Sequence, residues 1–253
     1  MLDRNSFESF LNEAAEYSPH GWTFDGIEER FVNGALPWSY TSIALPFIAK
    51  SSCMLDLDTG GGEFLADLPF QAEITFATEG HSPNITVAYK RLRALNIPLI
   101  AVDNSTSLLP FKGNSFDLVL GRHAAFSWNE VQRVLKPGGI FISQQVGSDN
   151  HVDLNLLLGA AKCNLTKVWN LDTALNQASE TGFSILSQGE AHPKDQIFDI
   201  GALLIHLKTV PWQIPDFNID SYHSQLLKLH DRINASSFVE VTSHRFFFVA
   251  QKR

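Results

Sequence analysis

The chain has 253 residues, of which 44% are hydrophobic and 18% charged, and its formal net charge is -8. This length predicts one large globular domain, and the acidic net charge disfavours a nucleic-acid partner. No run reaches the ~18 apolar residues of a membrane span, and the N-terminus lacks the basic and apolar regions of a signal peptide. The cysteines, Cys53 and Cys163, are isolated, which argues against a metal site and fits a reducing cytoplasm.

The first 45 residues precede any strand pattern. Their apolar positions, beginning with Phe7, Phe10, Leu11 and Ala14, predict a helical cap. His20 and Trp22, together with the distant Trp212, are candidates for substrate binding, although aromatic residues also serve as packing within a cap.

From residue 51 onward, apolar runs of strand length alternate with helical patterns, which is typical of a parallel α/β sheet. Strands are expected at 53–57, 72–78, 98–102, 116–120 and 140–143. Ser82-Pro83 predicts a helix start. A second helix is expected at 128–135, and Pro137-Gly138-Gly139 would end it.

The C-terminal half predicts a helix at 171–181, a strand at 183–186 and a last strand at 246–250, paired antiparallel with the one before it. The intervening residues 191–237 contain helical patterns at 200–207 and 222–233. Insertions of this length are usually functional, so we interpret this one as a substrate lid. The predicted fold is a single α/β domain over 1–253. It has a Rossmann-like, doubly wound, mostly parallel sheet of about seven strands with an antiparallel last strand, an N-terminal helical cap and a helical insertion.

The segment 54–65 predicts a buried strand, a turn at Gly60-Gly61-Gly62 and a helix start. Glycines allow a ligand to approach the backbone closely, and open α/β sheets bind ligands at such turns. A dinucleotide fingerprint needs a third glycine where this chain has Leu65, so a nicotinamide-dependent oxidoreductase is disfavoured. A Walker loop would need a Gly-Lys-Ser/Thr sequence, which is absent.

Five ordered motifs between residues 51 and 145 resemble those of class I S-adenosylmethionine-dependent methyltransferases, in particular the small type 11 group. They are Asp56-Leu57-Asp58-Thr59-Gly60-Gly61-Gly62, Glu79 at the end of the second strand, Asp103-Asn104 after the third, Leu109-Pro110-Phe111 with Ser115-Phe116-Asp117-Leu118-Val119, and Arg133 to Gly139. The resemblance implies S-adenosylmethionine as the cofactor. The cofactor-binding residues would be Asp56, Asp58, Thr59, Gly60, Gly61, Gly62, Glu79, Gly80, His81, Asp103, Asn104 and Arg122.

The chemistry of these side chains agrees with the roles that the resemblance implies. A carboxylate accepts two hydrogen bonds side by side, so Glu79 suits the two ribose hydroxyls. Asp103 or the carbonyl of Asn104 can accept from the adenine amine, although Asp103 also fits a turn. His81 could stack on adenine or be a plain loop residue.

Asp58 occupies a position where the family usually has glycine. Asp tolerates a positive φ at a cost of ~1 kcal/mol. A carboxylate ~4 Å from a charged group of the cofactor would change its binding by about 4 kcal/mol at an effective dielectric constant of 20. The sign depends on whether Asp58 faces the cofactor's cationic groups or its carboxylate. A binding or regulatory protein with a weakened cofactor site is therefore the alternative to an enzyme.

Catalysis of methyl transfer needs mainly positioning, because the cofactor carries the activated group. His123 is the candidate general base, with a pKa suited to neutral pH, and otherwise a loop residue. Gln144 and Gln145 are candidates for acceptor binding, or else structural residues. An Asn/Asp-Pro-Pro-Tyr motif is absent after the fourth strand, which argues against amino-directed nucleic-acid and protein substrates. A small-molecule methyl acceptor remains by elimination.

Overall fold

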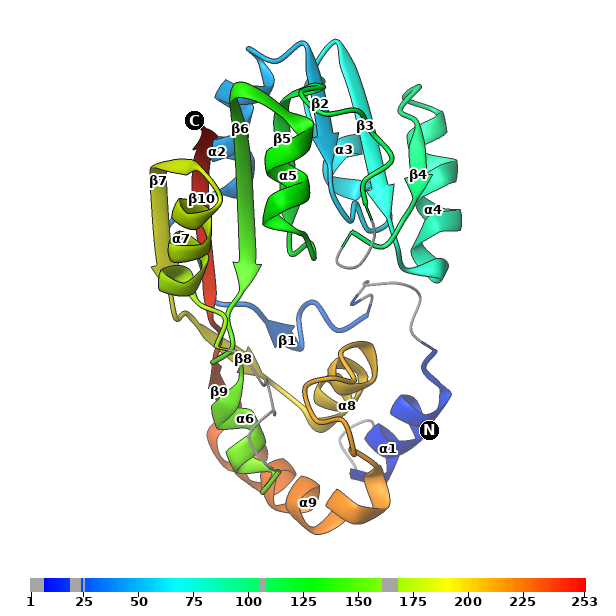
Figure 1. Ribbon diagram of the computed structural model, residues 1–253. Helices are drawn as coiled ribbons and strands as arrows, with labels where there is room; N and C mark the ends of the chain where they lie inside the picture. Colours follow the sequence, from blue (N-terminus) through cyan, green and yellow to red (C-terminus); the bar gives the residue numbers. More distant parts are fainter. Residues whose placement is uncertain (1–6, 19–23, 25, 105–107, 161–167) are drawn as a thin grey trace. The chain divides into compact units, whose positions relative to one another are not determined.

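The computed structural model describes residues 7–18, 24, 26–104, 108–160 and 168–253 (Figure 1). By the proximity of Cα atoms the chain forms two compact units. Unit 1 comprises residues 1–36, 148–167 and 191–244, and unit 2 comprises residues 37–147, 168–190 and 245–253. The predicted cofactor motifs all lie in unit 2.

Unit 2 is built on a seven-stranded sheet with the order β4-β3-β2-β5-β6-β10-β7 (Figure 1). The strands are β2 (Cys53–Asp56), β3 (Ile74–Glu79), β4 (Leu99–Ala101), β5 (Phe116–Arg122), β6 (Leu135–Val146), β7 (Phe183–Ala191) and β10 (Arg245–Lys252). The pairs from β4 through to β6 are parallel, and β10 runs antiparallel to β6. The predicted doubly wound sheet with an antiparallel last strand is confirmed.

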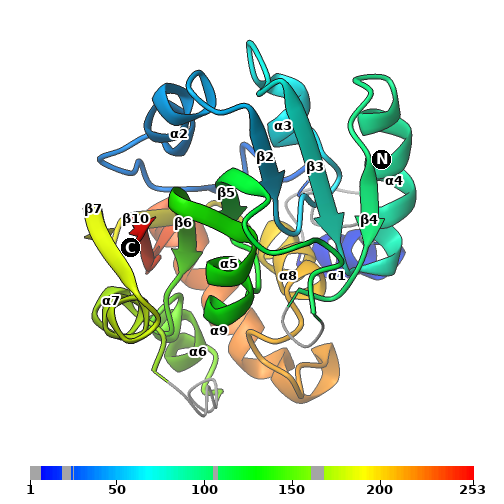
Figure 2. The same cartoon turned by 45° about the horizontal axis from the view of Figure 1, so that its top comes forward.

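Helices cover both faces of this sheet because its strands are apolar on both sides. Adjacent strand residues belong to different cores: Leu118 packs with one face and Val119 with the other. The first face carries α2 (Tyr40–Ile48), α3 (Glu63–Asp67) and α4 (Ser82–Arg93), and the second carries α5 (Trp128–Val134) and α7 (Leu171–Glu180) (Figure 2).

The start of β6 differs from the prediction. Pro137-Gly138-Gly139 was expected to separate a helix from a strand at 140–143, but these residues lie inside β6, which begins at Leu135. The register between β5 and β6 shifts here, so the stretch behaves as an irregularity of the strand. Gly138 has φ of +74°, and a Cβ on Gly139 would lie 2.8 Å from the carbonyl oxygen of Lys136.

In its described residues, unit 1 combines a three-stranded antiparallel sheet of order β1-β8-β9 with four helices. Its elements are β1 (Phe31–Val32), β8 (Lys194–Ile197), β9 (Val239–Thr242), α1 (Phe7–Glu16), α6 (Val152–Leu157), α8 (Ile200–Thr209) and α9 (Ile219–Ser236). The predicted helices at 200–207 and 222–233 are confirmed. Each has an N-cap, because the side chains of Asp199 and Asn218 accept hydrogen bonds from the first turns of α8 and α9.

The sequence predicts a helical insertion at 191–237, but the structure also places a strand, β8, within it, and β9 follows directly after it. β8 (Lys-Asp-Gln-Ile) has a single apolar residue and therefore gives no strand pattern in the sequence, whereas β9 (Val-Glu-Val-Thr) does alternate apolar and polar residues. Among the described residues, the model has no helix long and apolar enough to cross a membrane.

Candidate active site

The glycine turn follows β2 at the carboxyl edge of the large sheet. Gly60 and Gly62 have φ of +64° and +82°, conformations that favour glycine. A Cβ on Gly62 would also lie 2.9 Å from Cγ of Leu92 in α4. Leu65, which replaces the third glycine of a dinucleotide fingerprint, is fully buried. The turn is thus shaped by backbone conformation and by close packing of α4.

Glu79 ends β3 with its carboxylate fixed at this edge. The side chain is 2% exposed, and each oxygen accepts a hydrogen bond from a backbone N–H. The donors are Gly60, to Oε2, and His81, to Oε1, both at 2.7 Å. A carboxylate oxygen can accept more than one hydrogen bond, so both oxygens keep capacity for a further donor. The result is a rigid pair of neighbouring acceptors, the arrangement that a vicinal diol requires.

Asp58 connects three loops at the same edge. Its φ is +46°, so the position where the family usually has glycine does require a left-handed conformation. One carboxylate oxygen accepts from Nδ2 of Asn104, after β4, at 2.6 Å, and the other accepts from the N–H of Ala125, after β5, at 2.9 Å. The carboxylate of Asp58 is therefore held by protein donors on both sides.

Asn104 offers an acceptor to this region. The residue is 2% exposed, and while its Nδ2 donates to Asp58, its Oδ1 is buried with no hydrogen-bond partner in the described structure. An unpaired buried carbonyl costs about 1–3 kcal/mol, so it favours a ligand that donates a hydrogen bond there. The exposed Asp103 precedes it in the chain.

The edge carries a concentration of negative charge. Burial raises the pKa of Asp56 to about 7, and the charges of Asp58 and Glu79 act in the same direction. Burial is also the main cause that raises the pKa of Asp58 to about 6, with Glu79 and Asp103 adding to it. Carboxylates that raise one another's pKa create a negative potential, which attracts a cationic ligand.

His123 does not have the pKa that the sequence suggested. The residue is exposed, but desolvation by the protein atoms around its ring and the charges of Arg245 and Arg122 lower its pKa. Its Nε2 lies 3.2 Å from Nε2 of Gln144, whose Oε1 accepts from the indole N–H of Trp38 at 2.9 Å. The Gln144 amide therefore donates to His123, and the imidazole is neutral at pH 7.

The structure brings the remaining predicted cofactor residues to the same edge, because they end or follow β2, β3, β4 and β5. A Cβ on Gly80 would lie 3.1 Å from Cα of Asp103, so the loops after β3 and β4 approach closely. Gln145 is buried and donates to the carbonyl of Ala124 at 3.1 Å and to Ser143 at 2.7 Å. Its amide group therefore has a structural role, beside any contact with an acceptor.

Three predicted substrate contacts belong to chain segments outside unit 2. His20 and Trp22 lie outside the described residues. Trp212 follows α8 in unit 1 and is 52% exposed. These three assignments remain predictions.

Sequence reasoning missed two aromatic residues of unit 2. Tyr40 is buried at the start of α2, where its hydroxyl donates to the carbonyl of Ile142 at 3.3 Å and accepts from the N–H of Gly121 at 3.2 Å. Burial raises the pKa of this phenol. Trp38 holds Gln144. Neither Tyr40 nor Trp38 belongs to a sequence motif. Their contacts with β5 and β6 arise only from the fold.

Comparison with known proteins agrees with this geometry. A family model described as a methyltransferase domain matches residues 55–143, which include β2 through most of β6. The chain is similar to a probable methyltransferase, PMT26, of Arabidopsis thaliana, with 30% identity over 152 residues; the match covers 51% of this chain and 18% of that protein. The chain thus spans about a fifth of the length of this relative.

Solved structures share the fold. One is a putative methyltransferase, BH2331, from Bacillus halodurans C-125, with a TM-score of 0.56 and 17% identity, covering 84% of this chain and 98% of that one. Another is the [4+2]-cyclase SpnF, with a TM-score of 0.52 and 15% identity, covering 98% and 94%. The match over residues 55–143 is thus a similarity to a methyltransferase domain, and the solved structures show that the fold is shared.

Proposed function

We propose that this protein transfers a methyl group from S-adenosylmethionine to a small-molecule acceptor. One observation carries the proposal: the carboxylate of Glu79, fixed by two backbone N–H groups, lies at the same sheet edge as the unpaired buried carbonyl of Asn104. The first suits a ribose diol and the second suits the adenine amine. Both residues belong to the part of the chain that matches the methyltransferase family.

The residues of this edge also fit the charge of the cofactor. Its sulfonium and ammonium groups are cationic. At neutral pH Asp58, with a pKa of about 6, is mostly ionised, and Asp56, with a pKa of about 7, is ionised in part. Asp58 already accepts from Asn104 and Ala125. It acts on the ligand mainly through its charge and by fixing the amide of Asn104, whose carbonyl then remains available.

Bound S-adenosylmethionine would supply an electrophilic methyl group that needs no further activation. The protein has to orient the acceptor and exclude water. With a lowered pKa, His123 is a poor general base at neutral pH. Because its Nε2 accepts from Gln144, its Nδ1 carries the proton and can position an acceptor by donating a hydrogen bond.

Methyl transfer can be tested without knowing the acceptor. The purified protein is incubated with S-adenosylmethionine carrying an isotope-labelled methyl group and with a small-molecule extract from which macromolecules have been removed. The proposal predicts a labelled small molecule and an equal amount of S-adenosylhomocysteine. The same incubation with RNA or protein fractions should give no labelled product. Label only in a macromolecular fraction would contradict the small-molecule assignment.

The second candidate is a binding or regulatory protein that retains the fold without methyl transfer. Asp58 favours it, because this residue adds a charge where the family usually has glycine. The similarity to a [4+2]-cyclase shows the fold alone. The Asp58→Gly variant separates the two candidates. If the variant binds S-adenosylmethionine and the unmodified protein does not, the site is degenerate and the second candidate is correct.

A further inference from the structure

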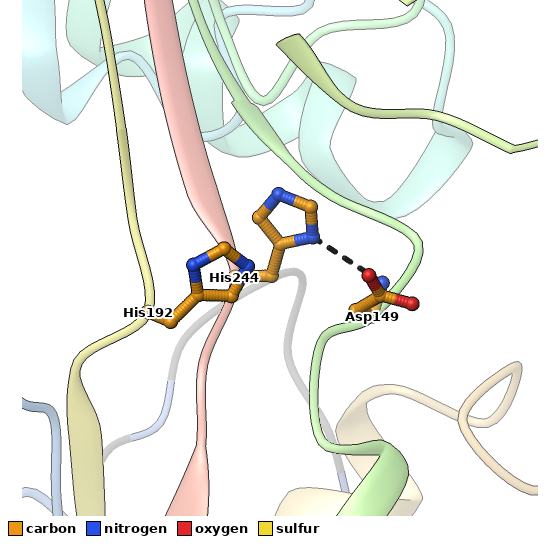
Figure 3. A group of neighbouring side chains, drawn as sticks. All are labelled: Asp149, His192 and His244. Atoms are coloured by element: carbon orange, nitrogen blue, oxygen red, sulfur yellow. Dashed lines mark hydrogen bonds between the residues drawn. The ribbon is translucent and has the colours of Figure 1, made fainter. Parts of the chain in front are cut away.

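Unit 1 brings together two histidines and one carboxylate from three separate segments. Asp149 precedes α6, His192 lies between β7 and β8, and His244 lies between β9 and β10. One potential ligand atom from each side chain lies within 4.8 Å of the others (Figure 3). The proposed methyltransferase chemistry uses none of these residues.

The backbone that carries these side chains is fixed by hydrogen bonds between the three segments. The residues that form these bonds are members of the group or lie within three positions of a member along the chain. They join the N–H of His244 to Oδ1 of Asn150 (3.1 Å), the N–H of Ser243 to the carbonyl of Pro193 (2.9 Å), the N–H of His151 to the carbonyl of Thr242 (2.8 Å), and Nε2 of His151 to Oδ2 of Asp195 (2.8 Å). Folding of unit 1 therefore assembles the group before any ligand binds, which lowers the cost of binding one.

The side chains themselves combine one fixed and two adjustable positions. His244 is 1% exposed, whereas Asp149 and His192 are exposed. The two imidazole rings stack with their centroids 4.4 Å apart, and in Figure 3 the ring of His244 lies between His192 and Asp149. The exposed side chains can change rotamer, and solvent can reach the group.

The observed separations are close to those of a coordinated ion. Bonds of ~2.1 Å in a tetrahedral site place ligand atoms roughly 3.4 Å apart, so atoms that lie within 4.8 Å of one another have to approach by at most about 1.4 Å. Besides the stacking of the two rings, the group contains one long hydrogen bond, in which the backbone N–H of Asp149 donates to Nδ1 of His244 at 3.3 Å. This exceeds the usual N–H···acceptor distance of about 2.9–3.0 Å, so a metal bond at Nδ1 would replace a weak interaction.

We propose that Asp149, His192 and His244 bind one divalent transition-metal ion of the zinc type, with solvent completing the coordination. Imidazole nitrogens with one carboxylate suit Zn²⁺, Co²⁺ or Ni²⁺, whereas Mg²⁺ and Ca²⁺ prefer oxygen ligands alone. Three protein ligands and one open position form the pattern of a solvent-accessible zinc site. None of the three residues is among those assigned to the cofactor, and this inference does not depend on the proposed methyl transfer.

The test is a Zn²⁺ titration of the full-length, untagged, chelator-treated protein against a competing chromophoric chelator. The unmodified protein should bind one equivalent with a micromolar dissociation constant. His192→Ala and Asp149→Asn should each weaken this binding about tenfold or more, because each removes one of three ligands. Both residues are exposed, so the variants should fold, and circular dichroism spectra check this. Co²⁺ should produce visible absorption that the double variant H192A/D149N lacks.

Matched controls come from the same unit. His223→Ala and Asp231→Asn remove an exposed histidine and an exposed carboxylate of α9, and they should leave the high-affinity equivalent unchanged. The proposal is overturned if the unmodified protein binds Zn²⁺ no more tightly than the H192A/D149N double variant. It is equally overturned if the control variants weaken binding as much as the ligand variants do.

Discussion

Asp58→Asn should stabilise the protein increasingly as the pH rises. The folded-state pKa of Asp58 is about 6, compared with 3.8 for an unperturbed carboxyl group. A folded-state pKa above the unfolded value means that the folded protein binds the proton more tightly. Ionisation therefore costs stability, and this cost increases as the pH rises from about 4 to about 6 and is constant above that.

The size of the effect follows from these two pKa values. A difference of 6 − 3.8 = 2.2 pKa units corresponds to about 3 kcal/mol when the carboxylate is fully ionised. Roughly half of that cost, about 1.4 kcal/mol, develops between pH 5 and pH 8. The asparagine of the variant can keep both hydrogen bonds of Asp58. Its oxygen can accept from Ala125, and rotation of the Asn104 amide would present the unpaired carbonyl of Asn104 to the side-chain N–H of the new asparagine.

The assay is urea denaturation at several pH values, followed by tryptophan fluorescence, with circular dichroism to check that the transitions coincide. The free energy of unfolding of the variant should increase relative to the unmodified protein by roughly 1–1.5 kcal/mol between pH 5 and pH 8. A difference that is constant over this range, or that changes in the opposite direction, would refute the assignment of a raised pKa to Asp58.

Asp117→Asn is the matched control of opposite sign. Burial opposes the ionisation of Asp117, but hydrogen bonds from Lys136 and from the N–H of Cys53 outweigh it and lower its pKa. The ionised form stabilises the fold above the unfolded-state pKa, and this contribution is lost only in acid. The control should therefore destabilise the protein by an amount that does not change between pH 5 and pH 8.

Three further predictions concern unit 2, and the last of them uses Gly26 of unit 1 as a comparison. The affinity for S-adenosylmethionine should rise about 3- to 10-fold from pH 5 to pH 8 as Asp56 and Asp58 ionise, and calorimetry at each pH should show a shallower rise for Asp58→Asn. The ring of His123, with its lowered pKa, should remain neutral throughout this range, and a histidine NMR resonance that titrates near pH 6.5 and is lost in His123→Asn would contradict this. Gly62→Ala should lower the free energy of unfolding by about 2–4 kcal/mol, since it combines a positive φ with a close contact. Gly26→Ala, with a similar φ and open space around it, should cost only about 1 kcal/mol in urea denaturation.

The sequence predicted the large sheet well because each of its strands and glycine turns follows a local rule. The apolar run before Gly60 and the serine and proline at the start of α4 are contiguous signals, and the structure confirms a strand and a helix start there. The N-cap of α4 is His81, however, and Ser82 is the first helical residue. The stretch Pro137-Gly138-Gly139 was misread because its turn residues also fit an irregular strand. The residues on either side of this stretch, Leu135 and Ile140, both pair with β5, and these pairs keep the stretch within one strand.

The details of the site depended on contacts between distant segments, which the sequence does not show. Asp58 was recognised as unusual, but its orientation follows from donors 46 and 67 positions away, in Asn104 and Ala125. The lowered pKa of His123 depends on Arg245, which β10 brings beside it. The histidines of the proposed metal site are 52 positions apart, a spacing that matches no metal-binding motif.

The most direct test of the account is calorimetric titration of the unmodified protein with S-adenosylmethionine, in parallel with the Glu79→Gln variant. Glutamine has a single side-chain carbonyl oxygen, so it cannot accept from both Gly60 and His81 and also present a pair of acceptors to a diol. The account predicts micromolar binding to the unmodified protein and at least tenfold weaker binding to the variant, at equal folding by circular dichroism. Absence of binding heat at millimolar ligand, or equal affinity of the two proteins, would contradict it.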